Sequence, residues 1–126
     1  MIAGLGLDIV KVSRIERLLE KHGERFLCRV YTGAERTELL KKNNSPDSLA
    51  ARFAAKEAAM KALGSGWGDG VGWRDVEILS GVSGRPELTL HGGAARIASE
   101  KRVCRAHLSI SHDGGMASAV VILEAN

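Results

Sequence analysis

The sequence predicts a single α+β domain over residues 1–126, and three observations carry this prediction. Alternating apolar patterns near both ends of the chain predict strands. An alanine-rich segment in the middle of the chain predicts a long helix. These elements follow one another without a regular strand–helix–strand alternation, which favours an α+β arrangement.

The chain opens with a predicted strand over residues 2–9, because the pattern of side chains alternates there. One face carries Ala3, Leu5, Leu7 and Ile9, and the other carries Ile2, Gly4, Gly6 and Asp8. Asp8 therefore ends the strand on the face where two glycines leave room. Its carboxylate either caps the helix that follows or serves as a ligand at a functional site.

Ser13 and Glu16 have the spacing of a capping box and predict a helix over 13–21. The side chains expected to point inward are Ile15, Leu18 and Leu19, and those expected to point outward are Arg14, Arg17 and Lys21. This basic outer face is either an ordinary solvated surface or a docking surface for an acidic partner protein.

Two further helices are predicted before the middle of the chain. Thr32 and Glu35 repeat the capping-box spacing and predict a short helix through Leu40. The alanine-rich segment predicts a long helix over 48–63, and Gly64 ends it.

One face of the long helix combines apolar and charged side chains, namely those of Ala50, Phe53, Ala54, Glu57, Met60 and Lys61. Burying the Glu57 carboxylate in such a stripe is costly unless it is paired or binds a metal. It either forms an ion pair with Lys61, four residues later, or acts as a ligand. If Asp8 and Glu57 converge, they form an all-oxygen site of the kind that suits Mg²⁺.

The remaining elements are strands at 76–78 and 87–90 with a turn over 81–86, a helix over 92–101, and strands over 106–111 and 117–123. Five glycines between residues 64 and 72 predict a loop, either a flexible connector or a close approach to a ligand. Neither standard phosphate-binding glycine motif is present. Trp67 and Trp73 in this region are either local anchors or a stacking surface for a base.

Histidine and serine side chains gather near the end of the chain. His112 and Asp113 are expected in a hairpin turn with Gly114 and Gly115, where His112 is either solvated or acts as a base. Ser109 and Ser111 point the same way as His107, which allows a Ser–His nucleophilic pair. The absence of a GxSxG motif argues against acyl-enzyme chemistry.

Composition excludes several classes of protein. The net charge is only +3 and aromatic residues make up 4%, which argues against a nucleic-acid-binding domain. No apolar run reaches the length of a membrane span, and the start of the chain lacks the features of a signal peptide. Two distant cysteines, Cys28 and Cys104, suggest reduced thiols in a cytoplasmic protein.

Three motifs together resemble a known family. They are Gly6-Leu7-Asp8, the segment from Phe53 to Lys61 with Lys56-Glu57-Ala58 at its centre, and Leu108-Ser109-Ile110-Ser111-His112-Asp113. In length and motif order, the whole chain resembles the holo-acyl-carrier-protein synthase group of phosphopantetheinyl transferases. The resemblance implies a small antiparallel sheet packed with a long helix and shorter helices.

The resemblance also implies an activity. Family members use Mg²⁺ to transfer the phosphopantetheine moiety of coenzyme A to a serine of apo acyl carrier protein, releasing adenosine 3′,5′-bisphosphate. They support fatty acid biosynthesis in the cytoplasm. Their short members are homotrimers with active sites at the subunit interfaces. From the composition of this chain, we expect neither a nucleic acid nor a membrane as a partner.

By the same resemblance, Asp8 and Glu57 match the Mg²⁺ ligands and Lys61 matches the lysine that contacts the pyrophosphate, while Lys56 is part of the motif. The residues expected to contact the nucleotide end of coenzyme A are Arg52, Gly84, Arg85, Pro86, Ser111 and His112. The acceptor for the serine proton is a metal-ordered water, Asp8 or Glu57, or His112. The outward face with Arg14, Arg17 and Lys21 would dock the carrier protein. The alternative function is a non-catalytic, Mg²⁺-dependent nucleotide-binding module.

Overall fold

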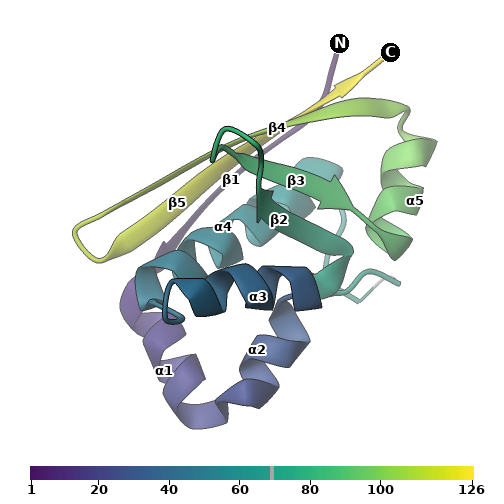
Figure 1. The fold of residues 1–126 in the computed structure, drawn as a ribbon. Coiled ribbons are helices and arrows are strands. Elements are labelled where there is room, and N and C mark those ends of the chain that lie inside the picture. The colour runs from purple at the N-terminus through teal and green to yellow at the C-terminus, as the bar shows by residue number, and fades with distance from the viewer. Residues whose placement is uncertain (69) are drawn as a thin grey trace.

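A computed structural model describes residues 1–68 and 70–126 (Figure 1). The elements are β1 (Ile2–Lys11), α1 (Val12–His22), α2 (Glu24–Val30), α3 (Gly33–Lys41), α4 (Pro46–Leu63), the short 3₁₀ helix η1 (Trp73–Asp75), β2 (Val76–Ser80), β3 (Pro86–Leu90), α5 (Gly92–Glu100), β4 (Val103–Asp113) and β5 (Met116–Ala125). Antiparallel strands mixed with helices confirm the predicted α+β class.

The larger sheet has three antiparallel strands in the order β1-β5-β4. The first strand of the chain therefore pairs with the last. The amino group of Met1 donates to the carbonyl oxygen of Ala125 at 2.9 Å, and Figure 1 shows the two termini side by side. β2 and β3 form a separate antiparallel hairpin. β1 and β4 are thus the two edges of the larger sheet.

The long helix α4 packs against the inner face of this sheet, with α1, α2 and α3 on its other side (Figure 1). The contact is unusually close, because a Cβ atom on Gly6 would lie 1.8 Å from the carbonyl oxygen of Ala58. A Cβ atom on Gly4 would lie 2.0 Å from the carbonyl oxygen of Ala62. Only glycine permits this approach. The room that these glycines leave is therefore filled by the backbone of α4.

The outer face of the sheet is apolar and exposed. Leu5, Leu7 and Ile9 of β1 are 63%, 65% and 62% exposed. Leu7 pairs with Val120, which in turn pairs with Ser109, so the apolar surface continues across β5 toward β4. These side chains lie side by side on one strand and form an exposed apolar patch.

The beginning of α1 differs from the prediction. Lys11, not Ser13, is the N-cap residue, and its side chain makes no capping hydrogen bond. β1 runs directly into α1, so Ser13 lies inside the first turn. The N–H of Val12 donates instead to the carbonyl oxygen of Gly115 at 2.9 Å, in the turn between β4 and β5. The capping box predicted from Ser13 and Glu16 is therefore wrong.

The capping box at Thr32 is confirmed, because Glu35 N–H donates to the Thr32 hydroxyl at 3.1 Å and Thr32 N–H donates to Glu35 Oε1 at 2.8 Å. α4 begins two residues earlier than predicted, with Ser45 as its N-cap and Pro46 in its first turn. In this position the fixed φ of proline suits a helix start.

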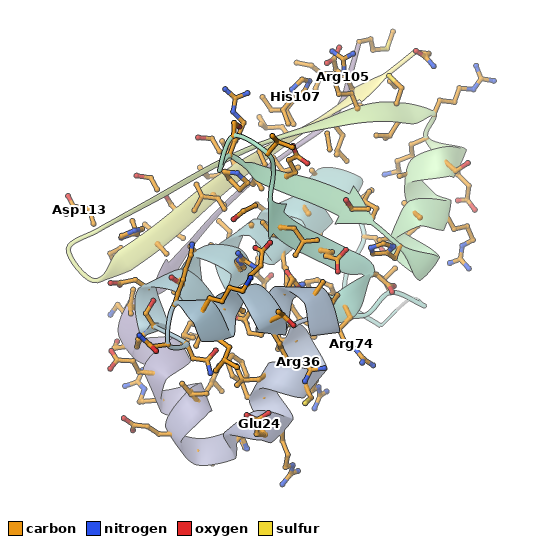
Figure 2. The ribbon with its side chains drawn as sticks, in the orientation of Figure 1. Glu24, Arg36, Arg74, Arg105, His107 and Asp113 are labelled. Carbon is orange, nitrogen blue, oxygen red and sulfur yellow. The ribbon has the colours of Figure 1, made fainter. Side chains whose placement is uncertain are left out.

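The last hairpin is also tighter than predicted. His112 and Asp113 belong to β4, and only Gly114 and Gly115 form the turn. Both glycines have positive φ, at 56° and 79°, which suits the two-residue turns that fit twisted hairpins. Figure 2 shows Asp113 beside this turn and His107 far from it along the same strand.

Cys28 and Cys104 are both exposed and free, which agrees with the expected reduced thiols. Within residues 1–68 and 70–126, no helix combines the length and the apolar character that crossing a bilayer requires.

Candidate active site

Asp8 and Lys61 meet where β1 passes over the last turns of α4. Lys61 Nζ donates to Asp8 Oδ1 and to the carbonyl oxygen of Leu7, each at 3.0 Å. The Asp8 side chain is 15% exposed and that of Lys61 is 55% exposed, so the pair lies at the rim of the core. Among the described residues, Lys61 thus forms its ion pair with Asp8 and not with Glu57. Asp8 does not cap α1 either.

Glu57 lies on the same side of α4 as Lys61, and its carboxylate is half-buried. Burial raises the pKa of Glu57, and the nearby Asp8 carboxylate raises it further. The indole N–H of Trp67 and the positive charges of Arg14 and Lys61 act in the opposite direction. The structure therefore brings the two carboxylates together with three groups that favour negative charge.

The donor set of this site fits Mg²⁺. Asp8 and Glu57 supply oxygen ligands, and the mutual repulsion that raises the pKa of Glu57 is what a divalent cation would relieve. Among the described residues, no three His, Cys, Asp or Glu side chains come together as a metal site, so Asp8 and Glu57 are a pair without a third such ligand. Two carboxylates suit Mg²⁺ because this ion keeps several waters and binds substrate phosphates alongside few protein ligands.

Lys56, the neighbour of Glu57, points to a different face of α4 and is fully buried. Its Nζ donates to Glu35 Oε1 at 2.8 Å, to the carbonyl oxygen of Trp73 at 3.1 Å and to that of Val76. Burial lowers the pKa of Lys56, and the Glu35 carboxylate opposes this effect. All three ammonium protons have acceptors, so this lysine is a structural tie between α4, α3 and the start of β2.

A second ion pair repeats this tie one turn earlier. Arg52 Nη2 donates to Glu38 Oε1 at 2.7 Å. The two glutamates of α3 also accept N–H groups from β2, Glu35 from Ile78 at 2.9 Å and Glu38 from Ser80 at 3.1 Å. Along the edge of β2 that has no neighbouring strand, these carboxylates accept the backbone N–H groups that a strand would otherwise bind.

A cavity of about 180 Å³ gathers most of the residues expected at the nucleotide end of coenzyme A. Arg52, Gly84, Pro86 and His112 line it, together with Ser80 and other residues of β2. Arg52 Nη1 is buried and has no hydrogen-bond partner among the described residues. An unpaired guanidinium N–H in a cavity wall is suited to an anionic group.

Two expected contact residues do not join this cavity. Ser111 is exposed on the outer face of the sheet, where it pairs with Ser118, because neighbouring residues of a strand point to opposite faces. Arg85 is exposed at the tip of the β2–β3 hairpin and is not among the residues lining the cavity. His112 lies on the inner face with Ile110, in β4 and not in a turn as predicted.

The basic face of α1 continues onto α2. Arg14, Arg17 and Lys21 are all exposed, as predicted. A cavity of about 370 Å³ beside Arg14 adds apolar and cationic walls, namely Leu18, His22, Arg25, Phe26, Arg29, Val30, Phe53 and Trp73. The sequence pattern does not predict α2. The buried residues Phe26, Leu27 and Val30, spaced for one helix face, are the signal that could reveal it.

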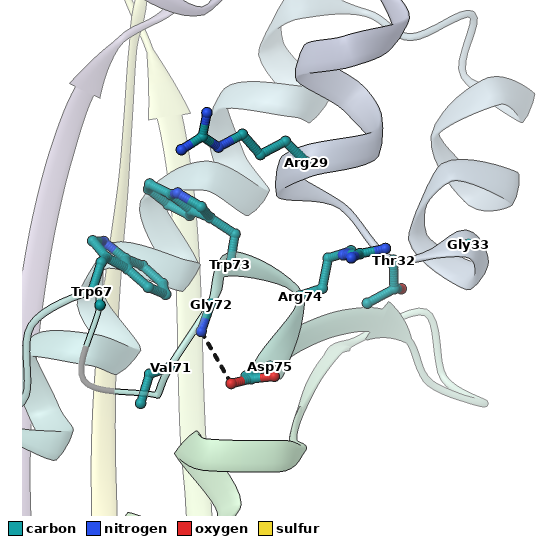
Figure 3. A pocket seen from close by; sticks show the side chains of 10 residues that line it. Arg29, Thr32, Gly33, Trp67, Val71, Gly72, Trp73, Arg74 and Asp75 are labelled. Carbon is teal, nitrogen blue, oxygen red and sulfur yellow. Dashed lines mark hydrogen bonds between the residues drawn. The ribbon is translucent and has the colours of Figure 1, made fainter.

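A larger, open cavity of about 770 Å³ lies between α2 and the glycine-rich loop (Figure 3). Trp67 and Trp73 stand along one wall, while Arg29 and Arg74 contribute positive charge. The two indoles stack on each other with centroids 4.1 Å apart. This mutual stacking supports the expectation that the two tryptophans anchor the loop locally.

Comparisons with known proteins identify the family. The family model of the 4′-phosphopantetheinyl transferase superfamily matches residues 4–113. A holo-[acyl-carrier-protein] synthase of Koribacter versatilis is 50% identical over 124 residues, which cover 98% of this chain and 99% of that protein.

Solved structures agree. The crystal structure of the Neisseria meningitidis holo-[acyl-carrier-protein] synthase superimposes with a TM-score of 0.89 at 38% identity, covering 98% of this chain and 99% of that one. The Helicobacter pylori enzyme in complex with coenzyme A gives a TM-score of 0.84 at 32% identity, covering 95% and 99%. The chain therefore belongs to the 4′-phosphopantetheinyl transferase superfamily, within its group of holo-[acyl-carrier-protein] synthases.

Proposed function

We propose that this protein transfers the phosphopantetheine moiety of coenzyme A to a serine of apo acyl carrier protein, with Mg²⁺ bound by Asp8 and Glu57. The observation that carries this proposal is the juxtaposition of two carboxylates and one lysine from β1 and α4. Family membership supplies the reaction, and the site supplies groups that fit it.

The reaction breaks a pyrophosphate linkage. The serine oxygen forms a new bond to the phosphorus that carries the pantetheine arm, and the bond from that phosphorus to the bridging oxygen breaks. The products are holo carrier protein and adenosine 3′,5′-bisphosphate, and the serine proton is released. Such a transfer depends on alignment and charge neutralisation more than on covalent catalysis.

Asp8 and Glu57 would hold Mg²⁺, and the bound ion would supply positive charge that stabilises negative charge on the phosphate groups. Lys61 adds a cation at the rim, where its half-exposed ammonium group can reach a bound phosphate as well as Asp8. Asp8 and the carbonyl oxygen of Leu7 hold this ammonium group in place before the substrate arrives.

The nucleotide end of coenzyme A would occupy the cavity lined by Arg52, Gly84, Pro86 and His112, where the unpaired guanidinium N–H meets a phosphate. This cavity and the carboxylate pair lie on opposite sides of α4 and near opposite edges of the sheet. Asp8 is paired with Ala119 of β5, which is paired with Ile110 of β4. Two strand spacings of about 4.8 Å separate the edges by roughly 10 Å.

A homotrimer would bring two such half-sites together. If the β1 edge of one chain meets the β4 edge of the next, the contact closes into a ring and repeats one composite site at each boundary. The exposed leucines and isoleucine of β1 are then covered by neighbouring chains. Ser111, on this same outer face, would contact the neighbour.

Subunit mixing tests this arrangement. Glu57→Gln and His112→Ala chains, each inactive alone, are exchanged and assayed together. Recovered activity is expected, because some boundaries then combine two intact halves. No recovery despite proven exchange, or full activity of a monomer, would show that each chain works alone.

The carrier protein would dock on α1 and α2. Arg14, Arg17 and Lys21 attract an acidic surface, and the adjoining cavity with Leu18 and Phe26 receives apolar side chains. Arg14→Glu with Arg17→Glu should weaken carrier binding and leave the affinity for coenzyme A unchanged. If neither the substitutions nor added salt changes the affinity for the carrier protein, this face is not the docking surface.

The function itself is tested by incubating the protein with coenzyme A, Mg²⁺ and apo carrier protein. Mass spectrometry should show one phosphopantetheine group added to the carrier, with adenosine 3′,5′-bisphosphate released. Tight binding of coenzyme A with no product would favour the alternative, a nucleotide-binding module. The two free, exposed thiols support a reducing compartment such as the cytoplasm as the place of action.

A further inference from the structure

An aromatic stack runs from α4 to the glycine-rich loop. The Phe53 and Trp73 ring centroids are 4.8 Å apart with an interplanar angle of 29°, and Trp67 stacks on the far side of Trp73 at 4.1 Å and 25°. The Arg14 guanidinium lies over Phe53, 5.3 Å from its centroid. Phe53 precedes Glu57 by one helical turn on the same face of α4. The stack therefore stands beside the proposed metal site.

The chain reverses direction to place Trp67 there. α4 ends at Leu63, and Gly64 turns the backbone with φ of 73°. From Glu57 to Leu63 the helix rises about 9 Å. The three residues from Gly64 to Trp67 can span about 10 Å when extended, which is enough to return along the helix. The N–H of Gly68 then donates to the carbonyl oxygen of Val71 at 3.1 Å and closes the loop.

Among the described residues, the indole N–H of Trp67 has no hydrogen-bond partner. Nε1 is buried and makes no hydrogen bond to any residue within 1–68 and 70–126. A buried donor without an acceptor is rare and costly, because it loses its water without replacement. The stack with Trp73 and Phe53 places this indole beside the face of α4 that carries Glu57, one turn after Phe53.

We propose that the indole N–H of Trp67 orients the Glu57 carboxylate for divalent metal binding, which makes Trp67 a positioning residue. This inference rests on the proposed function, because it takes Glu57 as a ligand. A carboxylate has about four lone-pair sites, so one oxygen can bind the ion while the other accepts the indole N–H. Groups that orient metal ligands in this way typically contribute 10- to 100-fold in affinity.

Trp67→Phe tests the proposal, since it keeps an aromatic ring in the stack and removes the indole N–H. Mn²⁺ binding is measured by electron paramagnetic resonance with coenzyme A present and no carrier protein, so no turnover occurs. The Mn²⁺ dissociation constant should rise about 10-fold or more in Trp67→Phe. It should stay unchanged in the matched variant Trp73→Phe, whose ring is in the same stack. Glu57→Gln should abolish the binding.

The outcomes separate the two proposals. If wild-type protein binds no Mn²⁺ beyond a coenzyme A control, the proposed metal site is wrong and the role of Trp67 falls with it. If wild-type protein and Trp67→Phe bind Mn²⁺ equally well, the metal site stands and the positioning role is overturned.

A second measurement does not depend on the folding of Trp67→Phe. The chain has two tryptophans, so in Trp73→Phe protein all tryptophan fluorescence comes from Trp67. When Mg²⁺ is added in the presence of coenzyme A, the emission of Trp67 should change, and the midpoint of this change should equal the midpoint of metal binding. Emission that stays constant while metal binds would overturn the proposal.

Discussion

Lys61 on α4 donates to Asp8 on β1 at 3.0 Å, across 53 positions of the sequence. The contact exists because Gly6 has no side chain, so the backbone of α4 can occupy the place where a Cβ atom would lie. The same approach brings Asp8 near Glu57. A lysine and two carboxylates are thereby fixed by backbone packing and not by a flexible loop.

Lys61→Ala should lower turnover by roughly 10²- to 10³-fold, because one preorganised cation is lost where negative charge develops. Lys61→Arg should restore only part of the rate, since a planar fork differs in shape from a point charge. The free energy of unfolding should change by less than about 1 kcal/mol, because the Lys61 side chain is half exposed. Steady-state rates and thermal unfolding measure the two effects. Unchanged turnover would show that Lys61 only forms a surface ion pair and has no role in transfer.

The metal-free stability should depend on the ionisation of Glu57. Because burial and Asp8 raise the pKa of Glu57, the folded state holds this proton more tightly than the unfolded state. Its contribution to the free energy of unfolding therefore falls as pH rises from the ordinary glutamate pKa through the raised one. Glu57→Gln should remove this decline and be more stable than wild type at neutral pH. Urea unfolding at several pH values in EDTA gives the comparison, and parallel pH curves would contradict it.

Gly6→Ala should destabilise the fold by roughly 3 kcal/mol, the upper end for overpacked cores. The added Cβ would lie 1.8 Å from a backbone oxygen, and backbone cannot move aside as a side chain can. Gly66→Ala is the matched control, because nothing lies within 4 Å of its added Cβ. Chemical denaturation of both variants measures the difference. Equal stabilities would mean that β1 and α4 do not need this close contact.

Lys56→Met should cost about 3–5 kcal/mol, because it leaves the buried carboxylate of Glu35 without its counter-ion. Adding Glu35→Gln should recover much of this loss, since a neutral amide no longer carries a buried charge. A double-mutant cycle of the free energies of unfolding yields the coupling between the two residues. Additive effects would show that the pair contributes no interaction energy of its own.

Local sequence patterns predicted several elements well. The Thr32–Glu35 capping box, the alanine-rich helix ended by Gly64 and the strand that leads to Asp8 are all present. These features depend on residues close together in the sequence. The Ser13–Glu16 box failed for a tertiary reason, because the N–H of Val12 is bonded to a turn more than 100 residues away.

Long-range contacts were beyond such patterns. Nothing near Lys56 in the sequence indicates that its partner is Glu35, 21 residues earlier, or that both are fully buried. The convergence of Asp8 with Glu57 likewise depends on how β1 crosses α4. The family resemblance supplied the pairing of Asp8 with Glu57 as an expectation. The Lys56–Glu35 pair emerged only from the structure, as did the buried N–H from which we propose a role for Trp67.

The most direct test of the central proposal is the initial rate of phosphopantetheine transfer to apo carrier protein as Mg²⁺ is raised, for wild type, Asp8→Asn and Glu57→Gln. Both substitutions keep the size of the side chain and remove the negative charge that a divalent cation requires. We expect saturable Mg²⁺ activation of the wild type and none in either variant, with circular dichroism showing that all three remain folded. Near-normal, Mg²⁺-dependent turnover in either folded variant would contradict the assignment of Asp8 and Glu57 as the metal ligands.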